Sequence, residues 1–292
     1  MMHPSESSDQ EDTRANARAL KVHLREVTVG RYTYRVVTLR PATTARFSTN
    51  FFHDTWHVLT DREGAFVLAR LLWGLAFQRE PGTVVLLDGA HLVPTPFEAD
   101  PPTPVLIVPA GLTRVDADLL RLLRARIGRP APSRTARWQT FGLPQALAAR
   151  DDPMWFHDRW RRQLAQEHMQ KLGGLICYSA PPDVLRWQAV SIYRMRSCRN
   201  MTYHYLAAER RRGGEAPDGE VQVFRDFRDM VSAAAVARRS VLEAHRSSTP
   251  IASDDERDAV QREAGRVDAR VRAGRRRKRK NRDSTVVERG RA

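Results

Sequence analysis

Residues 60–91 have the clearest pattern of hydrophobic and polar positions in the chain. Thr60 and Glu63 have the spacing of a capping box, in which each side chain binds the other residue's free backbone N–H at a helix start. Residues 66–77 are then apolar on nearly every face, which predicts a buried helix that ends at the Pro-Gly pair beyond it. Residues 83–87 follow without polar alternation, as in a strand that is covered on both faces.

Similar patterns lie on both sides of this stretch. Apolar and polar residues alternate over residues 20–39, around a Gly-Arg turn, which predicts a hairpin with one wet face and one packed face. Residues 104–109 predict another buried strand, and residues 113–127 carry the cap and the leucine stripe of a helix. Residues 137–141 predict an edge strand, whereas residues 41–59 are expected to be irregular or to form a short helix.

From about residue 143 onward the periodicity is mostly helical. The apolar positions predict helices over residues 152–172, 183–212 and 224–246, with residues 175–178 as a strand or a buried connection. A last helix is expected to begin at Ser253, where Glu256 completes a cap. No internal repeat is apparent in the sequence.

These elements predict the organisation of the whole chain. Strands and helices joined by short links indicate an α/β or α+β fold with a mixed sheet, an N-terminal hairpin and buried helices. We expect a disordered N-terminal segment, this α/β domain, a mainly helical region, and a terminal helix leading into a disordered basic tail, at residues 1–19, 20–142, 143–246 and 247–292.

The distribution of charge draws attention to the C-terminus. The formal net charge of the 292 residues is +15, and residues 271–292 contribute +8 of it, with ten Lys/Arg and two Asp/Glu. A run of cations without an intervening acid would bind phosphate backbones without sequence preference and in a salt-dependent way. These candidate nucleic-acid-binding residues are Arg272, Arg275, Arg276, Arg277, Lys278, Arg279, Lys280 and Arg282. An acidic protein partner, an RNA scaffold or plain solubility would use the same charges.

Other features of the composition exclude whole classes of protein. Two cysteines rule out a disulfide framework, and no apolar run reaches the roughly 18–20 residues of a membrane span. The polar, acidic N-terminus lacks the apolar core of a signal peptide. We therefore expect a soluble cytoplasmic protein with no membrane contact, whose helical half could also dock a protein partner.

The apolar strand at residues 83–87 runs into the sequence Asp88-Gly89-Ala90-His91. This strand end resembles the Mg²⁺-binding strand of P-loop ATPases and helicases, and the resemblance implies an acid where ligands collect in open α/β sheets. It covers eight residues, and the chain contains no G-x-x-x-x-G-K-[ST] loop to hold a triphosphate. Asp88 and His91 are catalytic candidates, and the alternative is a simple strand exit.

Two further groups could carry chemistry. The sequence His53-Asp54-Thr55-Trp56-His57 places two histidines four residues apart, and on a helix this spacing resembles the zinc site of the zincin metalloproteases, with Asp in place of their Glu. The alternative is a pair of histidines in an aromatic cluster. Cys177 could be an activated nucleophile ahead of a helix, or simply a buried thiol. The candidate bases for it are His157, His168 and His204.

The sequence therefore favours a soluble intracellular interaction protein whose basic tail contacts nucleic acid or another polyanion non-specifically. One alternative is a metal-dependent hydrolase that uses His53, His57, Asp88 and His91, with zinc as its metal. Another is a structural subunit of a larger assembly. No cofactor is expected under the first interpretation, and convergence of those four side chains in one pocket would favour the enzyme.

Overall fold

The computed structural model describes residues 20–127, 132, 134–148, 166–195, 201–207, 217–245 and 253–289, without the side chains of His245, Ser253, Arg272 and residues 275–289. The predictions for residues 1–19 and for most of the helix at residues 152–172 lie outside this part. The chain forms two compact units. Unit 1 is Met1–Leu92 with Thr103–Arg225, and unit 2 is Val93–Pro102 with Asp226–Ala292.

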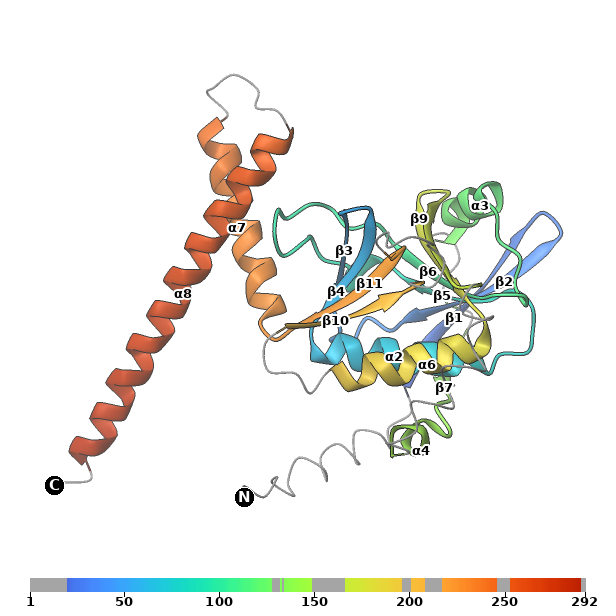
Figure 1. The fold of residues 1–292 in the computed structure, drawn as a ribbon, viewed down its shortest axis with the longest axis horizontal. Coiled ribbons are helices and arrows are strands. Elements are labelled where there is room, and N and C mark those ends of the chain that lie inside the picture. Colours follow the sequence, from blue (N-terminus) through green and yellow to red (C-terminus); the bar gives the residue numbers. More distant parts are fainter. Residues whose placement is uncertain are drawn as a thin grey trace. The chain divides into compact units, whose positions relative to one another are not determined.

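Unit 1 contains a seven-stranded mixed sheet, in the order β7-β1-β2-β5-β6-β9-β8 (Figure 1). Its strands are β1 (Leu20–Val29), β2 (Tyr32–Leu39), β5 (Thr83–Leu87), β6 (Val105–Pro109), β7 (Arg134–Trp138), β8 (His168–Leu172) and β9 (Leu175–Ala180). The predicted hairpin is confirmed, because β1 and β2 pair antiparallel. Both predicted apolar strands are confirmed as β5 and β6, which are buried at every position. The parallel pairs β2–β5 and β6–β9 make the sheet mixed, as predicted.

A second sheet of four strands, in the order β10-β11-β4-β3, is a feature that the sequence patterns did not predict. Its strands are β3 (Phe47–Phe52), β4 (Thr55–Thr60), β10 (Met201–Leu206) and β11 (Gly219–Phe224). The hairpins β3–β4 and β10–β11 join through the parallel pair β4–β11. Residues 41–59, expected to be irregular or helical, are therefore mostly strand.

The turn between β3 and β4 explains why this hairpin is hard to recognise. The two turn residues, His53 and Asp54, have φ angles of 48° and 59°. Two-residue hairpin turns need positive φ at these positions and usually contain Asn-Gly or Asp-Gly. Neither position is glycine here, so the strongest local signal of a hairpin is missing from the sequence.

The C-terminal half is only partly helical, which corrects the predicted helical region at residues 143–246. The helix expected over residues 183–212 ends at Met195, as α6 (Pro182–Met195), and is followed by β10. The end of the helix expected over residues 152–172 is β8. Both strands lie at sheet edges, and a few apolar residues in a short edge strand can mimic one stripe of a helix.

Helices cover both faces of the larger sheet. α2 (Arg62–Ala76) and α6 lie side by side on one face (Figure 1), where they share a core with residues of both sheets, among them Leu72, Leu87, Ile192 and Val221. α3 (Ala117–Ile127) covers a second core on the other face. The short helix α4 (Leu143–Ala148) and the single turn η1 (Gly89–His91) complete unit 1. Burial among these elements explains why α2 is apolar on nearly every face.

The start of α2 differs from the predicted capping box by one residue. Asp61 is the N-cap, and its Oδ1 accepts a hydrogen bond from the Gly64 N–H at 2.8 Å. Thr60 still belongs to β4, and its hydroxyl donates to the Arg46 carbonyl oxygen at 2.6 Å. Asp caps a helix at least as well as Thr, so the strand keeps Thr60 at no cost to the helix.

A structural repeat is visible in the strand pairing, although none is apparent in the sequence. The segments β3-β4-α2-β5-β6 and β8-β9-α6-β10-β11 have the same order of hairpin, helix and antiparallel pair. In each segment the strand before the helix pairs parallel with the last strand of the other segment, β4 with β11 and β9 with β6. Each sheet therefore contains strands from both halves of the repeat.

Unit 2 is built on a helical hairpin of α7 (Phe227–His245) and α8 (Ser253–Arg289) (Figure 1). α7 confirms the helix predicted near residues 224–246, and α8 begins at the predicted cap. α8 continues through the basic run, which was expected to be a disordered arm. Arg and Lys are good helix formers, so the run itself is compatible with a helix. No helix of the described residues is long and apolar enough to cross a membrane.

Candidate functional site

The residues predicted to bind nucleic acid lie on the part of α8 that extends past α7. α7 has 19 residues and α8 has 37, so the first 19 residues of α8, up to residue 271, match the length of α7. The other 18 residues continue for about 27 Å at 1.5 Å per residue, and Figure 1 shows α8 running on beyond the start of α7. We call residues 272–289 the basic extension.

The basic extension contains all eight candidate cations, Arg272, Arg275, Arg276, Arg277, Lys278, Arg279, Lys280 and Arg282. Residues 275–280 are six consecutive basic positions. With 3.6 residues per turn, six consecutive positions go round the whole circumference of a helix. This distribution suits contact with a phosphate backbone better than the reading of base edges, which needs a few side chains on one face.

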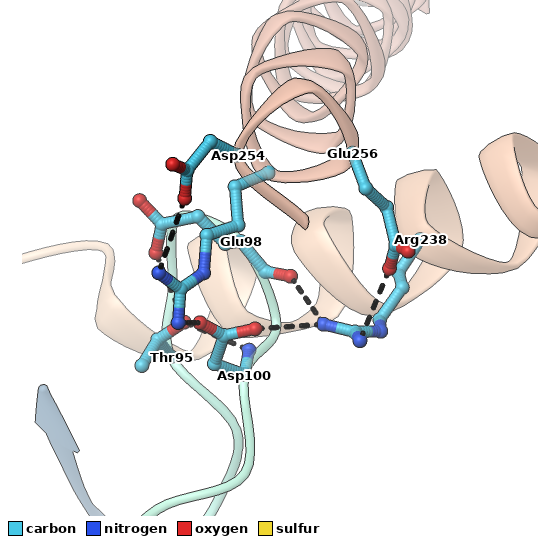
Figure 2. Close-up of polar contacts among 7 residues, drawn as sticks. Thr95, Glu98, Asp100, Arg238, Asp254 and Glu256 are labelled. Atoms are coloured by element: carbon cyan, nitrogen blue, oxygen red, sulfur yellow. Dashed lines mark hydrogen bonds and ion pairs between the residues drawn. The ribbon is translucent and has the colours of Figure 1, made fainter. Parts of the chain in front are cut away.

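The N-terminal part of α8 is held by the loop Val93–Pro102, which lies between β5 and β6 in the sequence. Asp100 binds both helices (Figure 2): its Oδ1 is 2.8 Å from Nη1 of Arg238 in α7, and its Oδ2 is 2.9 Å from Nη2 of Arg257 in α8. Arg238 in turn reaches Glu256 Oε1 of α8 at 3.2 Å. One loop carboxylate therefore ties the two helices together.

Thr95 and Ala99 give this loop its shape. Thr95 is 1% exposed, its backbone N–H donates to the Asp100 carbonyl oxygen at 2.9 Å, and its Oγ1 accepts from the Asp100 N–H at 3.0 Å. Ala99 has a φ of 55°, and its side chain enters a small core with Ala237 and Val260. Unit 2 is therefore a tertiary structure assembled from two distant segments of the chain.

His53 and His57 lie on the β3–β4 hairpin, so the helical spacing of a zincin site does not apply to them. His53 is exposed in the turn, whereas His57 in β4 is 6% exposed, and no hydrogen-bond partner for its Nδ1 is found among the described residues. Nε2 of His57 is 3.9 Å from Oε2 of Glu220. Burial lowers the pKa of His57 and raises the pKa of Glu220, so both shifts oppose an ion pair between them.

Asp88 and His91 lie near the other end of β3 from His57. The residue after His91 bridges to Phe47 at the start of β3, whereas His57 pairs with Asn50, three residues further along. Three residues of strand span about 10 Å. The four residues of the proposed hydrolase site therefore form two separate pairs rather than one cluster.

Burial dominates the electrostatics of Asp88 and His91. It raises the pKa of the Asp88 carboxyl, although Arg25 and His91 act in the opposite direction. It lowers the pKa of His91, whose Nδ1 is 3.3 Å from the Ala45 carbonyl oxygen. Within the ranges that the structure covers, no group of three or more His, Cys, Asp or Glu side chains could hold a metal ion.

Cys177 lies in β9, in the core beneath α3. Burial raises the pKa of its thiol to about 12, so the thiolate needed for nucleophilic attack is disfavoured. The next residue, Tyr178, belongs to the core on the other face of the sheet. Of the candidate bases, His204 is connected through Gln188 and Glu167 to Tyr178, so it lies on the face of the sheet opposite Cys177. His168 is in β8, and His157 is outside the described residues.

A buried polar network joins the two sheets, and no sequence pattern predicted it. Glu167 is 1% exposed, and its Oε1 accepts hydrogen bonds from the Tyr178 hydroxyl at 2.5 Å and the Gln188 amide at 2.7 Å. The Gln188 amide oxygen is 2.5 Å from Nε2 of His204. Since the Gln188 nitrogen donates to Glu167, its oxygen accepts, and Nε2 of His204 carries the proton.

One signal could have identified this network. Gln188 lies on the apolar face of α6, beside Leu185 and Ile192, and is fully buried. A buried glutamine needs partners for both its oxygen and its nitrogen, so an amide in an apolar stripe indicates further polar groups nearby. Neither the partners nor their distance in the chain could be inferred from that stripe alone.

Comparison with known proteins supplies no relative, because no family model, no curated protein and no solved structure matches the chain. The function must therefore be inferred from the charge and geometry of the chain itself.

Proposed function

We propose that this protein binds nucleic acid, or another polyanion, without sequence preference through the basic extension of α8. The observation that carries the proposal is the coincidence of the cations with the stretch of α8 beyond the length of α7. A polyanion can lie along that stretch without displacing α7. The charge density suits a ligand with closely spaced phosphates, since each cation that contacts a phosphate releases a condensed counterion.

Two features support a helical and anchored extension. Asp254, Asp255 and Glu256 lie in the first turn of α8, where their negative charge complements the positive end of the helix dipole. The N-terminal half of α8 is fixed by the ion pairs to Asp100 and Arg238 and by the apolar contacts of Val260. The extension thus continues from a folded unit rather than from a free linker.

The test measures binding of a labelled duplex and a labelled single strand to the full chain over a range of salt concentrations. Removal of residues 272–292 should lower affinity at about 100 mM salt by at least ~100-fold, because most phosphate contacts are lost. Replacing four cations (Arg276, Arg277, Lys278 and Arg279) by Gln should make the plot of log affinity against log salt shallower by up to about 0.9 per lost contact on duplex DNA. Gln has a helix propensity close to that of Arg and Lys, so α8 should be retained.

A matched control removes the same charge elsewhere. Arg62, Arg79, Arg121 and Arg239 are all exposed and lie outside the basic extension. Their replacement by Gln should change affinity by less than about threefold, because long-range attraction between exposed charges is screened at this salt. Equal losses in the two four-residue variants would mean that net charge alone drives binding, and unchanged binding after the truncation would refute the proposal.

A further inference from the structure

Three cations lie side by side at one end of the seven-stranded sheet. Lys21 of β1 pairs in register with Arg137 of β7. On its other side Val22 pairs with Leu39, which places Lys21 opposite Arg40, the first residue after β2. We call Lys21, Arg40 and Arg137 the basic face. With neighbouring strands about 4.8 Å apart, its outer members are roughly 10 Å apart at the backbone.

The three side chains share one face of the sheet. Their neighbours Val22, Leu39 and Trp138 belong to the core that includes α2 and α6. Successive residues of a strand point to opposite faces, so the basic face lies on the side where α3 packs. Lys21 and Arg137 are exposed there, and Arg40 is half-buried.

The described part of the chain forms no ion pair with the basic face. Among described residues, no hydrogen bond or ion pair is made by the side chains of Lys21, Arg40 and Arg137, and the Nε atom of Arg40 is buried without an acceptor. Asp88 follows the adjacent strand β5 and lies next to Arg40 in register, but no ion pair joins it to these three cations among the described residues. A guanidinium that is partly removed from water with unused donors gains from binding an anion there.

Neighbouring cations of the same hairpin behave differently. Arg25 donates to the Ile127 carbonyl oxygen at 3.0 Å, and Arg35 forms an ion pair with Glu80. These arginines have a structural partner, whereas the three cations of the basic face have none among the described residues. The contrast separates the basic face from these two arginines of the same hairpin.

We propose that the basic face is a second contact for the phosphodiester backbone of nucleic acid, on unit 1. Three cations across roughly 10 Å match a backbone that carries one charge per about 3.4 Å of axis on each strand. Arginine can bind a phosphate through two parallel N–H donors, which lysine cannot. This inference rests on the proposed function for the identity of the ligand, but it concerns different residues.

The experiment compares four full-length proteins: wild type, Lys21→Gln/Arg40→Gln/Arg137→Gln, the four-residue basic-extension variant, and the combination of both. The basic-face variant should bind a single-stranded oligonucleotide of about 20 nucleotides at least ~5-fold more weakly at 100 mM salt. Its plot of log affinity against log salt should be shallower by about 0.7 for each of up to three lost contacts. Arg62→Gln/Arg79→Gln/Arg121→Gln is the matched control, and less than a twofold change is expected.

The four proteins distinguish failure of this inference from failure of the proposed function. Unchanged affinity and slope in the basic-face variant overturn the inference, whereas unchanged affinity in the basic-extension variant overturns the proposed function. Because Arg40 is half-buried, Lys21→Gln/Arg137→Gln serves as a second variant at two exposed positions, and thermal unfolding checks that both are folded. Loss of inorganic phosphate or mononucleotide binding without loss of oligonucleotide binding would also overturn the inference, since the ligand would then be a free phosphate.

Discussion

His204 illustrates how its surroundings determine the chemistry of a side chain in unit 1. Burial lowers the pKa of His204 to about 4, and the Gln188 amide oxygen accepts a hydrogen bond from Nε2–H of the neutral ring at 2.5 Å. Protonation would add a charge that lies next to an amide and the ring of Trp187 rather than next to a carboxylate. The folded state therefore favours the neutral imidazole.

This shift predicts how stability depends on pH. The pKa of His204 is about 4 in the folded protein and about 6.5 in the unfolded chain, so the unfolded state binds the proton more tightly. The contribution of His204 to stability is complete above pH ~6.5 and is lost as the pH falls from there toward ~4, by at most about 3 kcal/mol. Urea unfolding at a series of pH values measures it.

The control is His204→Gln, which keeps an N–H donor for Gln188 but does not titrate. Between pH 6.5 and pH 4 the free energy of unfolding of this variant should fall less than that of the wild type. At pH 7.5 the variant should be the less stable of the two proteins. His57 and His91 also have lowered pKa values and remain in the variant, so the difference between the two curves isolates His204. Parallel curves would contradict the assignment.

Single residues also show what the sequence can and cannot predict about a site. The cations at residues 275–280 could be recognised because consecutive like charges need no tertiary structure to interact with a polyanion. The separation of His57 from His91 could not be recognised from the sequence, because it depends on a hairpin turn at His53 and Asp54 that lacks glycine. The partners of Gln188 come from β10 and from the residue before β8, which in turn binds Tyr178 of β9, and no local pattern connects these segments.

At the scale of elements, the loop Val93–Pro102 acts as the third component of the α7–α8 hairpin. Its carboxylate at Asp100 contacts both helices, and its Ala99 side chain contributes to the small core of alanines and valines. Alanine-rich helices bury little apolar area against each other. The stability of this hairpin therefore depends more on the loop than that of a leucine-rich hairpin would.

The substitution Asp100→Ala tests this dependence. It removes the ion pairs to Arg238 and Arg257, which are partly exposed, so we expect a loss of about 1 kcal/mol that shrinks at high salt. Hydrogen exchange of the α7 and α8 amides measures the local opening. Glu263→Ala is the control, because the ion pairs of Glu263 found among the described residues, with Arg266 and Arg270, lie within α8. Equal exchange in wild type and Asp100→Ala would show that the loop does not hold the helices.

The strands that could be predicted have either a continuous apolar run or an alternation of apolar and polar residues in their sequence. β5 and β6 are buried on both faces and read as apolar runs, and β1–β2 alternates around a glycine turn. β8 and β10 were not predicted because they are edge strands whose positions are mostly exposed or half-buried, so that pairing with β9 and β11 determines their structure more than their own residues do.

At the scale of the whole molecule, unit 1 consists of two similar halves that exchange strands. The parallel pairs β4–β11 and β6–β9 each join one half to the other. Local sequence patterns do not reveal such an exchange, because the hydrophobic period of a strand is the same whichever strand it pairs with. The mixed sheet could be predicted, but the exchange could not.

Two truncations test the role of this exchange. A chain that ends after Arg225 keeps both sheets and should unfold cooperatively on heating. A chain that ends after Leu206 lacks β11, the strand that joins β10 to β4, so the smaller sheet is cut in two. We expect it to lose the cooperative transition, measured by far-ultraviolet circular dichroism. A cooperative transition in the shorter chain would show that β3–β4 and α2 do not need β11.

The pairing of β4 with β11 also determines how late in translation the smaller sheet can be completed. Trp56 pairs with Gly219, so 163 residues must be added after β4 has been translated before its partner strand exists. At roughly 5–20 residues per second, the ribosome needs about 8–30 s for this stretch. During that interval the nascent chain holds a hairpin whose inner edge is open to other chains. Correct assembly of unit 1 therefore depends on keeping that edge unoccupied until translation of β11.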